Sequence, residues 1–400
     1  MNLKAFFRSL PSGLSRVTSG GKFIREIDGL RFLAILPVVI QHTSERTVRK
    51  LPEELASQGD TMGAFLTQNG GAGVFLFFVI SGFILSLPFA KMHLYGGSKV
   101  KLKKYFGRRI TRLEPPYIIW MTVFLLVVLI KGMYTFSEIL PHYFLSLVYL
   151  HNAVFLKYSF INPVAWSLEV EIQFYLLAPL LTWIFFREKN VIRRRTFLIL
   201  SWIAMMALQQ YAGWLHYPYR LFIIGHLHYF LLGFLLTDVY LSDWQGERKM
   251  HRIWDLIGIV AFGAMFATYS ETGSNVIFTC CLGLLMASVF LGPLLNRMIT
   301  NPWITAIGGM CYTIYLIHLP ILELQFTFTE KFIVFNNFYS NFFIQLSIAL
   351  AVILPASVIG FLALEKPCMD PKWPQHLRTW LTQKVSTSSK LPANAQQSEG

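Results

Sequence analysis

An arginine and a histidine are spaced by a whole number of helical turns in the segment EIDGLRFLAILPVVIQH. Arg31 and His42 are eleven residues apart, close to three turns, so we expect both on one side of a helix, about 16 Å apart along its axis. His42 could then act as a general base, because imidazole exchanges protons near neutral pH. The alternative is that Arg31 and His42 only anchor the two ends of the helix. Asp28 opens the same segment.

Two carboxylates lie among apolar residues in WSLEVEIQFYLLAPLL. Glu169 and Glu171 have almost no polar neighbours in sequence, and a carboxylate in such a place needs a partner or a wet cavity. Either one could accept a proton or orient an imidazole. Solvation of both carboxylates at an interface is the alternative.

Two arginines in RRITRLEPPY are placed to bind phosphate. Arg109 and Arg112 are three residues apart and share one helix face. Guanidinium groups in this arrangement can bind phosphate in a bidentate way, which lysine cannot do. Attraction of the whole basic segment to anionic lipid headgroups is the competing interpretation.

Other polar residues favour structural interpretations. Ser81 and Gly82 interrupt the apolar run GVFLFFVISGFIL, where small residues promote close helix packing. His318 follows YTIYLI near the end of the chain, and a packing histidine bonded to a backbone carbonyl is favoured over a catalytic one. The remaining histidines and the four cysteines have no compact ligand spacing, so we expect no metal site and no disulfide framework.

The composition indicates that membrane helices hold these residues. The chain has 400 residues, of which 54% are hydrophobic and 14% charged, whereas soluble domains have about 25% charged residues. Helices that are apolar all round suit a bilayer, so a soluble globular enzyme is excluded. The net charge of +14 comes from basic residues clustered between apolar segments, a positive-inside pattern that removes nucleic acid as the default partner.

The loop charges fix a topology. Residues 91–113 hold eight Lys and Arg without an acidic residue, and residues 187–195 hold five, so both loops are expected in the cytoplasm. The apolar run at 139–156 then cannot cross and is interfacial or re-entrant. We therefore expect an all-α integral membrane protein with about ten transmembrane helices and cytoplasmic N- and C-termini. The expected spans are 29–44, 72–90, 114–131, 166–186, 196–212, 219–241, 253–269, 276–295, 303–324 and 340–364.

Three parts are expected along the chain. Residues 1–24 form a cytoplasmic N-terminal segment without the apolar core of a signal peptide. Residues 25–365 form the membrane domain. Residues 366–400 are a polar cytoplasmic tail, which we expect to be disordered because its composition cannot bury a core.

Five motifs, taken in order, resemble the acyltransferase-3 family of integral membrane O-acyltransferases. The opening segment is similar to the family's IDGLR element with its arginine and histidine, here Arg31 and His42. The run GVFLFFVISGFIL is similar to FFVxSGF, and RRITR carries the RxxR pattern. The segment WSLEVE resembles WSLxxE, and YTIYLIH resembles YxxYLIH, which places further family positions at Trp166, Ser167, Glu171, Tyr312, Tyr315 and His318.

The resemblance implies transfer of an acyl group, most simply acetyl from acetyl-CoA in the cytoplasm, to a hydroxyl of an acceptor at the outer side of a bacterial plasma membrane. The acceptor would be a surface glycan such as lipopolysaccharide, or a lipid-linked saccharide. Arg31, Arg109 and Arg112 would bind the donor phosphates. His42 would act as general base or transient acyl carrier, oriented by Glu171, and the oxyanion donor is left open among Ser167, Trp166 and Tyr315. Asp28, Ser81 and His318 are supporting candidates.

Two differences from the family pattern affect these expectations. Some members append an extracytoplasmic esterase-like domain, and this sequence predicts none, so transfer would be completed in the membrane domain or by a separate protein. Glu169 beside Glu171 also departs from the pattern and could alter the acceptor pocket. A polytopic transporter, or a flippase for a glycan or lipid-linked precursor, stays open as a second class of function, although the broken helices typical of transporters are not evident.

Overall fold

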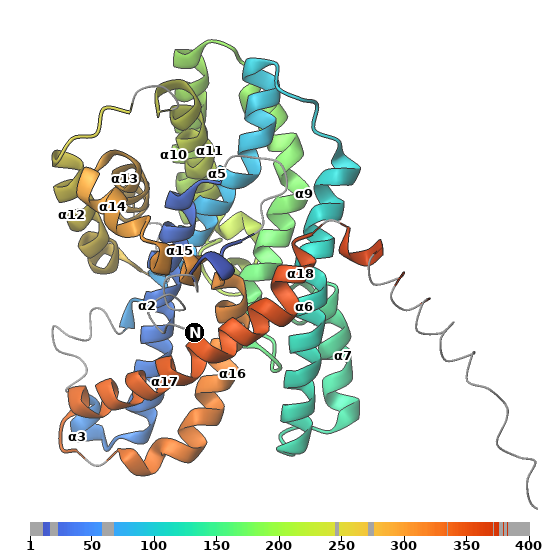
Figure 1. Ribbon diagram of the computed structural model, residues 1–400, viewed down its shortest axis with the longest axis vertical. Helices are drawn as coiled ribbons and strands as arrows, with labels where there is room; N and C mark the ends of the chain where they lie inside the picture. The colour runs from blue at the N-terminus through green and yellow to red at the C-terminus, as the bar shows by residue number, and fades with distance from the viewer. Residues whose placement is uncertain are drawn as a thin grey trace, which may run out of the picture.

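A computed structural model describes residues 11–16, 23–57, 68–244, 248–270, 276–333, 335–370, 372–375, 379 and 382. Every regular element in these ranges is a helix (Figure 1). The all-α prediction is therefore confirmed for the described part of the chain. Most of the two expected terminal segments, 1–24 and 366–400, lies outside it.

Long helices follow the apolar runs of the sequence. They are α2 (Arg25–Lys50), α5 (Ala72–Tyr95), α6 (Leu102–Ile130), α9 (Trp166–Phe186), α10 (Val191–Tyr211) and α17 (Phe338–Gly360). The shorter ones are α3 (Glu53–Ala56), α7 (Phe136–Leu147), α8 (His151–Phe155), α11 (Leu227–Val239), α12 (Ile253–Thr268), α13 (Val276–Leu291), α14 (Pro293–Ile299), α15 (Pro302–Gly309), α16 (Cys311–Thr329) and α18 (Lys366–Cys368). The helical turn η6 (Glu330–Phe332) ends α16.

Several helices can cross a bilayer. In the described residues, four helical segments are long and apolar enough, at 72–95, 102–130, 163–186 and 338–368. The number rises to six if the bent pairs α13–α14 and α15–α16, with bends of 90° and 67°, each count as one span. The chain is thus a polytopic membrane protein. The helices α2, α10 and α11 coincide with further expected spans but do not combine this length with this apolarity, so the ten-span topology stays a prediction.

The apolar run at 139–156 forms α7 and α8 rather than a crossing helix. The twelve residues of α7 extend about 18 Å, which is shorter than a hydrocarbon core of about 30 Å. A capping box between Thr135 and Glu138 starts the helix. The chain then returns alongside α6 in a hairpin (Figure 1).

Close approach of α5 to its neighbours builds the core. A side chain at Gly82 would place its Cβ 2.4 Å from the carbonyl oxygen of Phe230 in α11, and one at Gly233 would place it 2.4 Å from the carbonyl oxygen of Val79. Only glycine allows this approach, so the expected packing role of the SGF segment is confirmed at Gly82. The helix α5 also packs against α2 and α9, which brings three of the five motifs together.

A bend between two consecutive helices brings α16 to the far half of α2. The helix α15 packs on the first turns of α2 so tightly that a Cβ at Gly308 would overlap the carbonyl of Asp28. The 67° bend between α15 and α16 follows at once and directs α16 along the rest of α2 (Figure 1).

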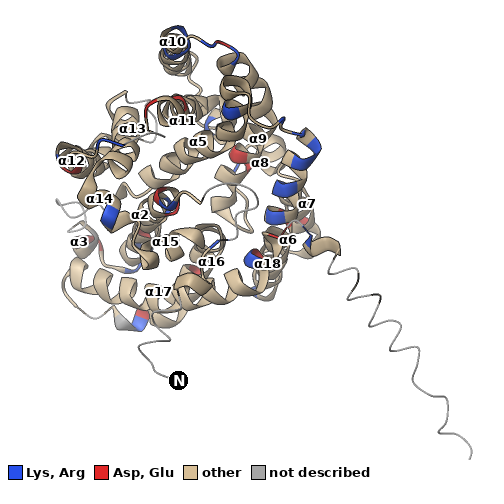
Figure 2. Ribbon diagram, turned by 45° about the horizontal axis from the view of Figure 1, so that its top comes forward, with Lys and Arg blue, Asp and Glu red and all other residues tan. Residues whose placement is uncertain are grey.

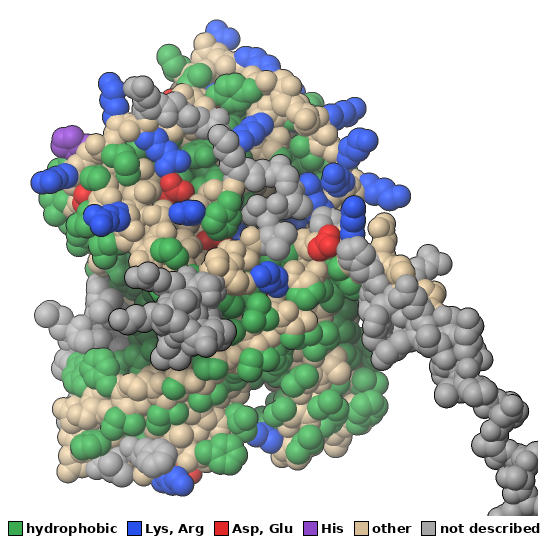
Figure 3. Space-filling model, viewed as in Figure 1, with side chains coloured by type: hydrophobic (Ala, Val, Ile, Leu, Met, Phe, Trp, Pro, Cys, Tyr) green, Lys and Arg blue, Asp and Glu red, His purple; other side chains and the backbone are tan. Residues whose placement is uncertain are grey.

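Charged residues are unevenly distributed over the molecule. Basic turns are visible at the beginning of α6 (Figure 2), and Lys and Arg side chains gather over the upper half of the molecule (Figure 3). The lower half of the same face is mainly hydrophobic, with few charges near its lower end (Figure 3). The helix α2 runs from the middle of the molecule down to α3 at its lower end (Figure 1), so its two halves lie in different surroundings.

Candidate functional site

His42 has a carboxylate partner on its own helix. The Nδ1 atom of His42 lies 3.0 Å from an Oε2 atom of Glu45, one turn further along α2. The side-chain amide of Gln41 donates to the other carboxylate oxygen of Glu45, and Arg46 lies 3.2 Å from Oε2. The Nε2 atom of His42 bonds to none of the described residues. A carboxylate on Nδ1 holds an imidazole in the tautomer whose Nε2 can accept a proton.

A second imidazole faces His42 across the contact between α2 and α16. The ring centroids of His42 and His318 are 5.4 Å apart, with 31° between the ring planes. The Nδ1 of His318 lies 3.0 Å and 2.8 Å from the carbonyl oxygens of Ile314 and Tyr315, as expected for a histidine bonded to the backbone. Its Nε2 is buried without a partner in the described chain. His318 thus borders the space beside His42.

Glu171 has partners other than His42. Its Oε1 accepts hydrogen bonds from Ser81 Oγ at 2.5 Å and from Tyr175 OH at 2.7 Å. The expectation that Glu171 orients His42 therefore differs from the structure, where Glu45 takes that place. Glu45 lies three positions after His42 on the same helix, whereas Glu171 comes from α9 and meets the serine of α5. Ser81, expected to serve packing, instead joins Glu171 in a polar pair.

Ser167 and Tyr315 meet between the beginning of α9 and α16. Their hydroxyl oxygens are 2.9 Å apart, and the Tyr315 hydroxyl also donates to the carbonyl oxygen of Val164. The Tyr315 ring lies 6.3 Å from that of His318, so the pair adjoins the two histidines. Trp166 lies apart from it, and its ring is 5.5 Å from the ring of His226.

The arginine of the opening motif is held by Asp28. The Nη1 of Arg31 lies 2.5 Å from Oδ1 of Asp28, and Nη1 of Arg16 lies 2.9 Å from the same oxygen. The side chain of Asp28 is 3% exposed, so two cations stabilise one buried carboxylate. Asp28 is therefore the residue that organises this end of α2.

Arg109 and Arg112 have different partners although they share a helix. Arg112 forms an ion pair of 3.5 Å with the fully buried Glu365, which also accepts a hydrogen bond from Thr313. Arg109 stacks over the ring of Tyr105 with its guanidinium carbon 3.7 Å from the ring centroid, and it forms no ion pair within the described residues. Its guanidinium also lies 5.3 Å from the ring centroid of Tyr175, the residue that binds Glu171.

These contacts arrange the candidate residues in a row through the bundle. Arg109 faces Tyr175, which donates to Glu171, and Tyr315 joins Ser167 to the two histidines. Among the residues singled out from the sequence, Arg112 and Trp166 have other partners, and Asp28 and Arg31 form the ion pair at the beginning of α2.

A buried histidine pair lies outside the crossing helices. Nδ1 of His142 in α7 is 2.8 Å from Nε2 of His151 in α8. Burial lowers the pKa of both groups, that of His151 to about 4, and the neighbouring His142 lowers the pKa of His151 further, while Lys157 lowers that of His142. The described residues contain no group of three or more His, Cys, Asp or Glu placed to hold a metal ion, and the expectation of a metal-free site stays an expectation.

A family model for an acyltransferase domain matches residues 24–362, which is most of the chain. This chain belongs to the acyltransferase-3 family. It is therefore a member of a family of membrane O-acyltransferase enzymes, and the resemblance carried by the five motifs is confirmed.

Curated relatives point to the same family. The O-acetyltransferase OatA of Staphylococcus aureus strain NCTC 8325 is 23% identical over 326 residues, which cover 75% of this chain and 51% of OatA, and OatA of strain COL matches equally well. A second protein of that species, named as a candidate O-acetyltransferase, is 23% identical over 332 residues, covering 76% of this chain and 51% of that protein. The chain thus spans about half the length of the relatives it matches. No solved structure matches the chain.

Sequence reasoning missed four residues of the candidate site. Glu45 could have been found, because a carboxylate three residues after a histidine on a helix lies on the same face. Arg46 could have been found in the same way, because a residue four positions after a histidine also lies on its helix face. Arg16 lies twelve residues before Asp28 and outside α2, and Glu365 is far from Arg112 along the chain, so no helical spacing links them to Arg31 or Arg112.

Proposed function

We propose that this protein transfers an acyl group, most simply acetyl, from acyl-CoA in the cytoplasm to a hydroxyl of a glycan or lipid-linked saccharide at the outer side of a bacterial plasma membrane. The proposed topology has ten spans with both termini in the cytoplasm. The basic half of the molecule then faces the cytoplasm, where positive charge is favoured. His42 and His318 lie toward the outer side.

The pairing of His42 with Glu45 is the observation that carries the proposal. A histidine with a carboxylate 3.0 Å from Nδ1 and with no partner for Nε2 among the described residues is arranged as a general base. The carboxylate holds the tautomer and stabilises the imidazolium that forms during transfer. Ionisable side chains are costly inside a membrane domain. The presence of His42 and Glu45 there therefore favours a functional role.

The donor would bind through the arginines at the basic half. CoA carries a 3'-phosphate and a pyrophosphate, and guanidinium groups bind phosphate in a bidentate way. Two observations fit such a ligand. Arg109 has no carboxylate partner among the described residues, and the buried Nε of Arg112 has no hydrogen-bond partner there. Arg31 would contribute from α2, and the pantetheine arm would extend from this end toward His42.

In the proposed reaction, His42 accepts a proton and later returns it. Nε2 takes the proton of the acceptor hydroxyl while the hydroxyl oxygen attacks the thioester carbonyl carbon. The tetrahedral intermediate collapses with breakage of the carbon–sulfur bond, and the imidazolium returns the proton to the CoA thiolate. The ester and free CoA are the products. In the alternative order, Nε2 attacks the thioester carbonyl carbon first, and the carbon–sulfur bond breaks to release CoA thiolate. The acceptor hydroxyl then takes the acyl group from His42, and its proton goes to the thiolate.

The oxyanion of that intermediate needs a hydrogen-bond donor. The hydroxyls of Ser167 and Tyr315 are the best placed of the three candidates, because Tyr315 adjoins His318 while Trp166 lies toward His226. Glu171 and Ser81 would position the middle of the row between donor and base.

Reconstitution with labelled donor tests the proposal. The full chain, purified and placed in lipid vesicles with [14C]acetyl-CoA and bacterial envelope glycans, should transfer label to the glycan as an alkali-labile ester. His42→Ala should stop this transfer while binding of acetyl-CoA, measured by calorimetry, persists. Label that remains on the protein when glycan is omitted would select the acyl-carrier order. Uptake of labelled glycan into the vesicles without esterification would refute acyl transfer in favour of transport.

A further inference from the structure

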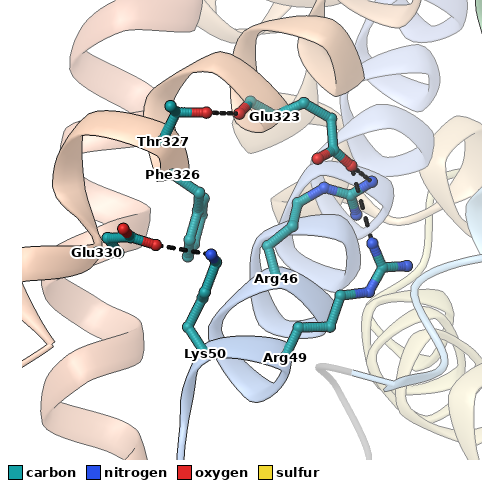
Figure 4. A pocket seen from close by; sticks show the side chains of 7 residues that line it. All are labelled: Arg46, Arg49, Lys50, Glu323, Phe326, Thr327 and Glu330. Atoms are coloured by element: carbon teal, nitrogen blue, oxygen red, sulfur yellow. Dashed lines mark hydrogen bonds and ion pairs between the residues drawn. The ribbon is translucent and has the colours of Figure 1, made fainter. Parts of the chain in front are cut away.

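A pocket opens beside His42 at the far end of α2 (Figure 4). It lies between the last two turns of α2 and the end of α16 with η6, and its volume is about 250 Å³. Three basic and two acidic side chains line it together with one aromatic and one hydroxyl side chain. These are Arg46, Arg49, Lys50, Glu323, Glu330, Phe326 and Thr327.

Arg46 connects this pocket to the proposed base. Its Nη1 donates to the carbonyl oxygen of His42 at 3.0 Å and lies 3.2 Å from the Glu45 carboxylate that holds His42. Its Nη2 lies 2.7 Å from Oε1 of Glu323 on the pocket wall. A group bound at Arg46 is therefore one helical turn, about 6 Å along the axis, from His42.

The pocket holds more positive than negative charge. Glu323 neutralises Arg46, and Glu330 neutralises Lys50 at 2.6 Å. Arg49 lies 3.9 Å from the same Glu323 oxygen that Arg46 already occupies, and its side chain is 63% exposed. The ion pair of Arg49 is therefore long, and its exposed guanidinium can still reach a ligand. In the proposed topology this surplus lies on the outer side, where the positive-inside bias makes basic residues uncommon.

A second observation points to a ligand rather than to a solvated surface. The side chain of Arg46 is 7% exposed, lines the pocket, and leaves its buried Nε without a hydrogen-bond partner in the described residues. A buried donor without a partner is costly unless a bound group or water satisfies it. Arg46 and Arg49 thus line the same space, and Arg46 keeps one N–H group without a partner in the described residues.

The side chains favour one class of ligand. Guanidinium groups bind carboxylates and phosphates, and the two glutamates can accept hydrogen bonds from hydroxyls. We propose that this pocket binds the acceptor, and that the acceptor is a saccharide carrying an anionic substituent, a carboxylate or a phosphate, which Arg49 and Arg46 bind while a neighbouring hydroxyl reaches His42. This inference rests on the proposed function, since it assigns the acceptor side of the same reaction.

Binding of small saccharides to the full chain in neutral phosphatidylcholine vesicles tests the proposal. The probes are methyl glucuronoside and glucose 1-phosphate, with methyl glucoside as the uncharged control, followed by saturation-transfer NMR. We expect at least one anionic probe to bind about tenfold more tightly than methyl glucoside, as one charge-assisted contact predicts. Arg49→Gln should remove this preference, and Arg49→Lys should retain part of it.

Arg297→Gln provides the matched control, because Arg297 is an exposed arginine on α14 outside the pocket. It should leave the preference unchanged. Equal binding of all three probes, or a preference that survives Arg49→Gln, would overturn the proposal. A lipid headgroup is the other possible ligand. If phosphatidylglycerol in the vesicles abolished probe binding, and if that lipid bound in a way that depends on Arg49, the pocket would be a lipid site and the proposal would be overturned.

The two proposals fail separately. Selective probe binding with no acetyl transfer by the wild-type protein would refute the proposed function alone. The opposite outcome is acetyl transfer that depends on His42, with the same KM for an anionic acceptor in wild type and Arg49→Gln. That result would refute the pocket assignment alone.

Discussion

The two ends of α2 bear the same kinds of charged residue in opposite arrangements. At the basic end, Asp28 is 3% exposed and holds Arg16 and Arg31 in close ion pairs. At the other end, Glu45 is 36% exposed and holds His42, whose Nε2 has no partner among the described residues. The first end satisfies its charges internally, and the second leaves a reactive atom unpaired.

This difference indicates two ways of preparing a site inside a membrane. Partly buried arginines need carboxylates to offset the loss of hydration, so Asp28 and Glu365 hold in place the arginines that we propose as the donor-binding groups. A general base needs a free nitrogen, which a partly exposed setting allows at lower cost. We therefore expect changes at the His42 end to affect turnover and changes at the arginine end to affect donor binding.

Removal of the base should have the largest effect. His42→Ala should reduce the rate of acetyl transfer by a factor of about 10² to 10⁴, the usual range for a general base. Calorimetry should show acetyl-CoA binding with an unchanged Kd, because the arginines lie at the other end of the helix. His216→Ala, at an exposed histidine, is the control. Weakened donor binding in His42→Ala would contradict the division of roles.

Neutralising the partner of the base should have a smaller effect of the same kind. Glu45→Gln keeps the shape of the side chain but removes the charge that stabilises a His42 imidazolium. We expect kcat to fall by roughly ten- to a hundredfold, with little change in the KM for acetyl-CoA. The pH profile of kcat should shift as well, which a purely structural role would not produce. Glu54→Gln, at an exposed glutamate, serves as control.

Substitution of an arginine proposed to bind the donor should raise the KM for acetyl-CoA. Arg109→Lys keeps the charge but loses the planar group that stacks on Tyr105 and can bind phosphate in a bidentate way. We expect the KM for acetyl-CoA to rise by about tenfold while kcat changes little. Arg108→Lys, at the preceding position, is the matched control. A fall in kcat with unchanged KM would place Arg109 with the base instead of the donor.

The smallest effect on turnover is expected at the His142–His151 pair. The folded-state pKa of His151, about 4, lies below the ordinary value near 6.5, so the unfolded chain takes up protons first as the pH falls. The pair therefore stabilises the fold above pH 6.5, and that stability is lost between pH 6.5 and 4. His151→Gln should flatten the dependence of Tm on pH in this range while acetyl transfer at pH 7.5 is retained. An unchanged pH dependence would show that other groups control acid stability.

Local patterns predicted the helices and several functional positions. Long apolar runs located α5, α6, α9 and α17, whereas the run at 139–156 forms the short helices α7 and α8, and its interfacial or re-entrant position stays a prediction. The eleven-residue spacing of Arg31 and His42 holds because α2 continues unbroken between them. The spacing of Arg109 and Arg112 also holds, but their partners differ.

Long-range contacts escaped prediction for a physical reason. A spacing on one helix says which residues share a face, but it does not say which other helix covers that face. Ser81 meets Glu171 only because α5 packs against α9, and His318 meets His42 only because the chain bends before α16. Such pairings depend on the packing of the whole bundle, so a single sequence could not assign them.

Mass spectrometry of surface glycans tests the central claim most directly. Glycans would be compared from cells that lack the protein and from the same cells supplied with wild type, His42→Ala or Arg112→Lys, with membrane levels of each protein matched by immunoblotting. We predict an acetyl ester that appears with the wild type, is absent with His42→Ala, and is reduced with Arg112→Lys in a way that raised acetyl-CoA supply restores. An ester formed at the wild-type level by His42→Ala would contradict the account.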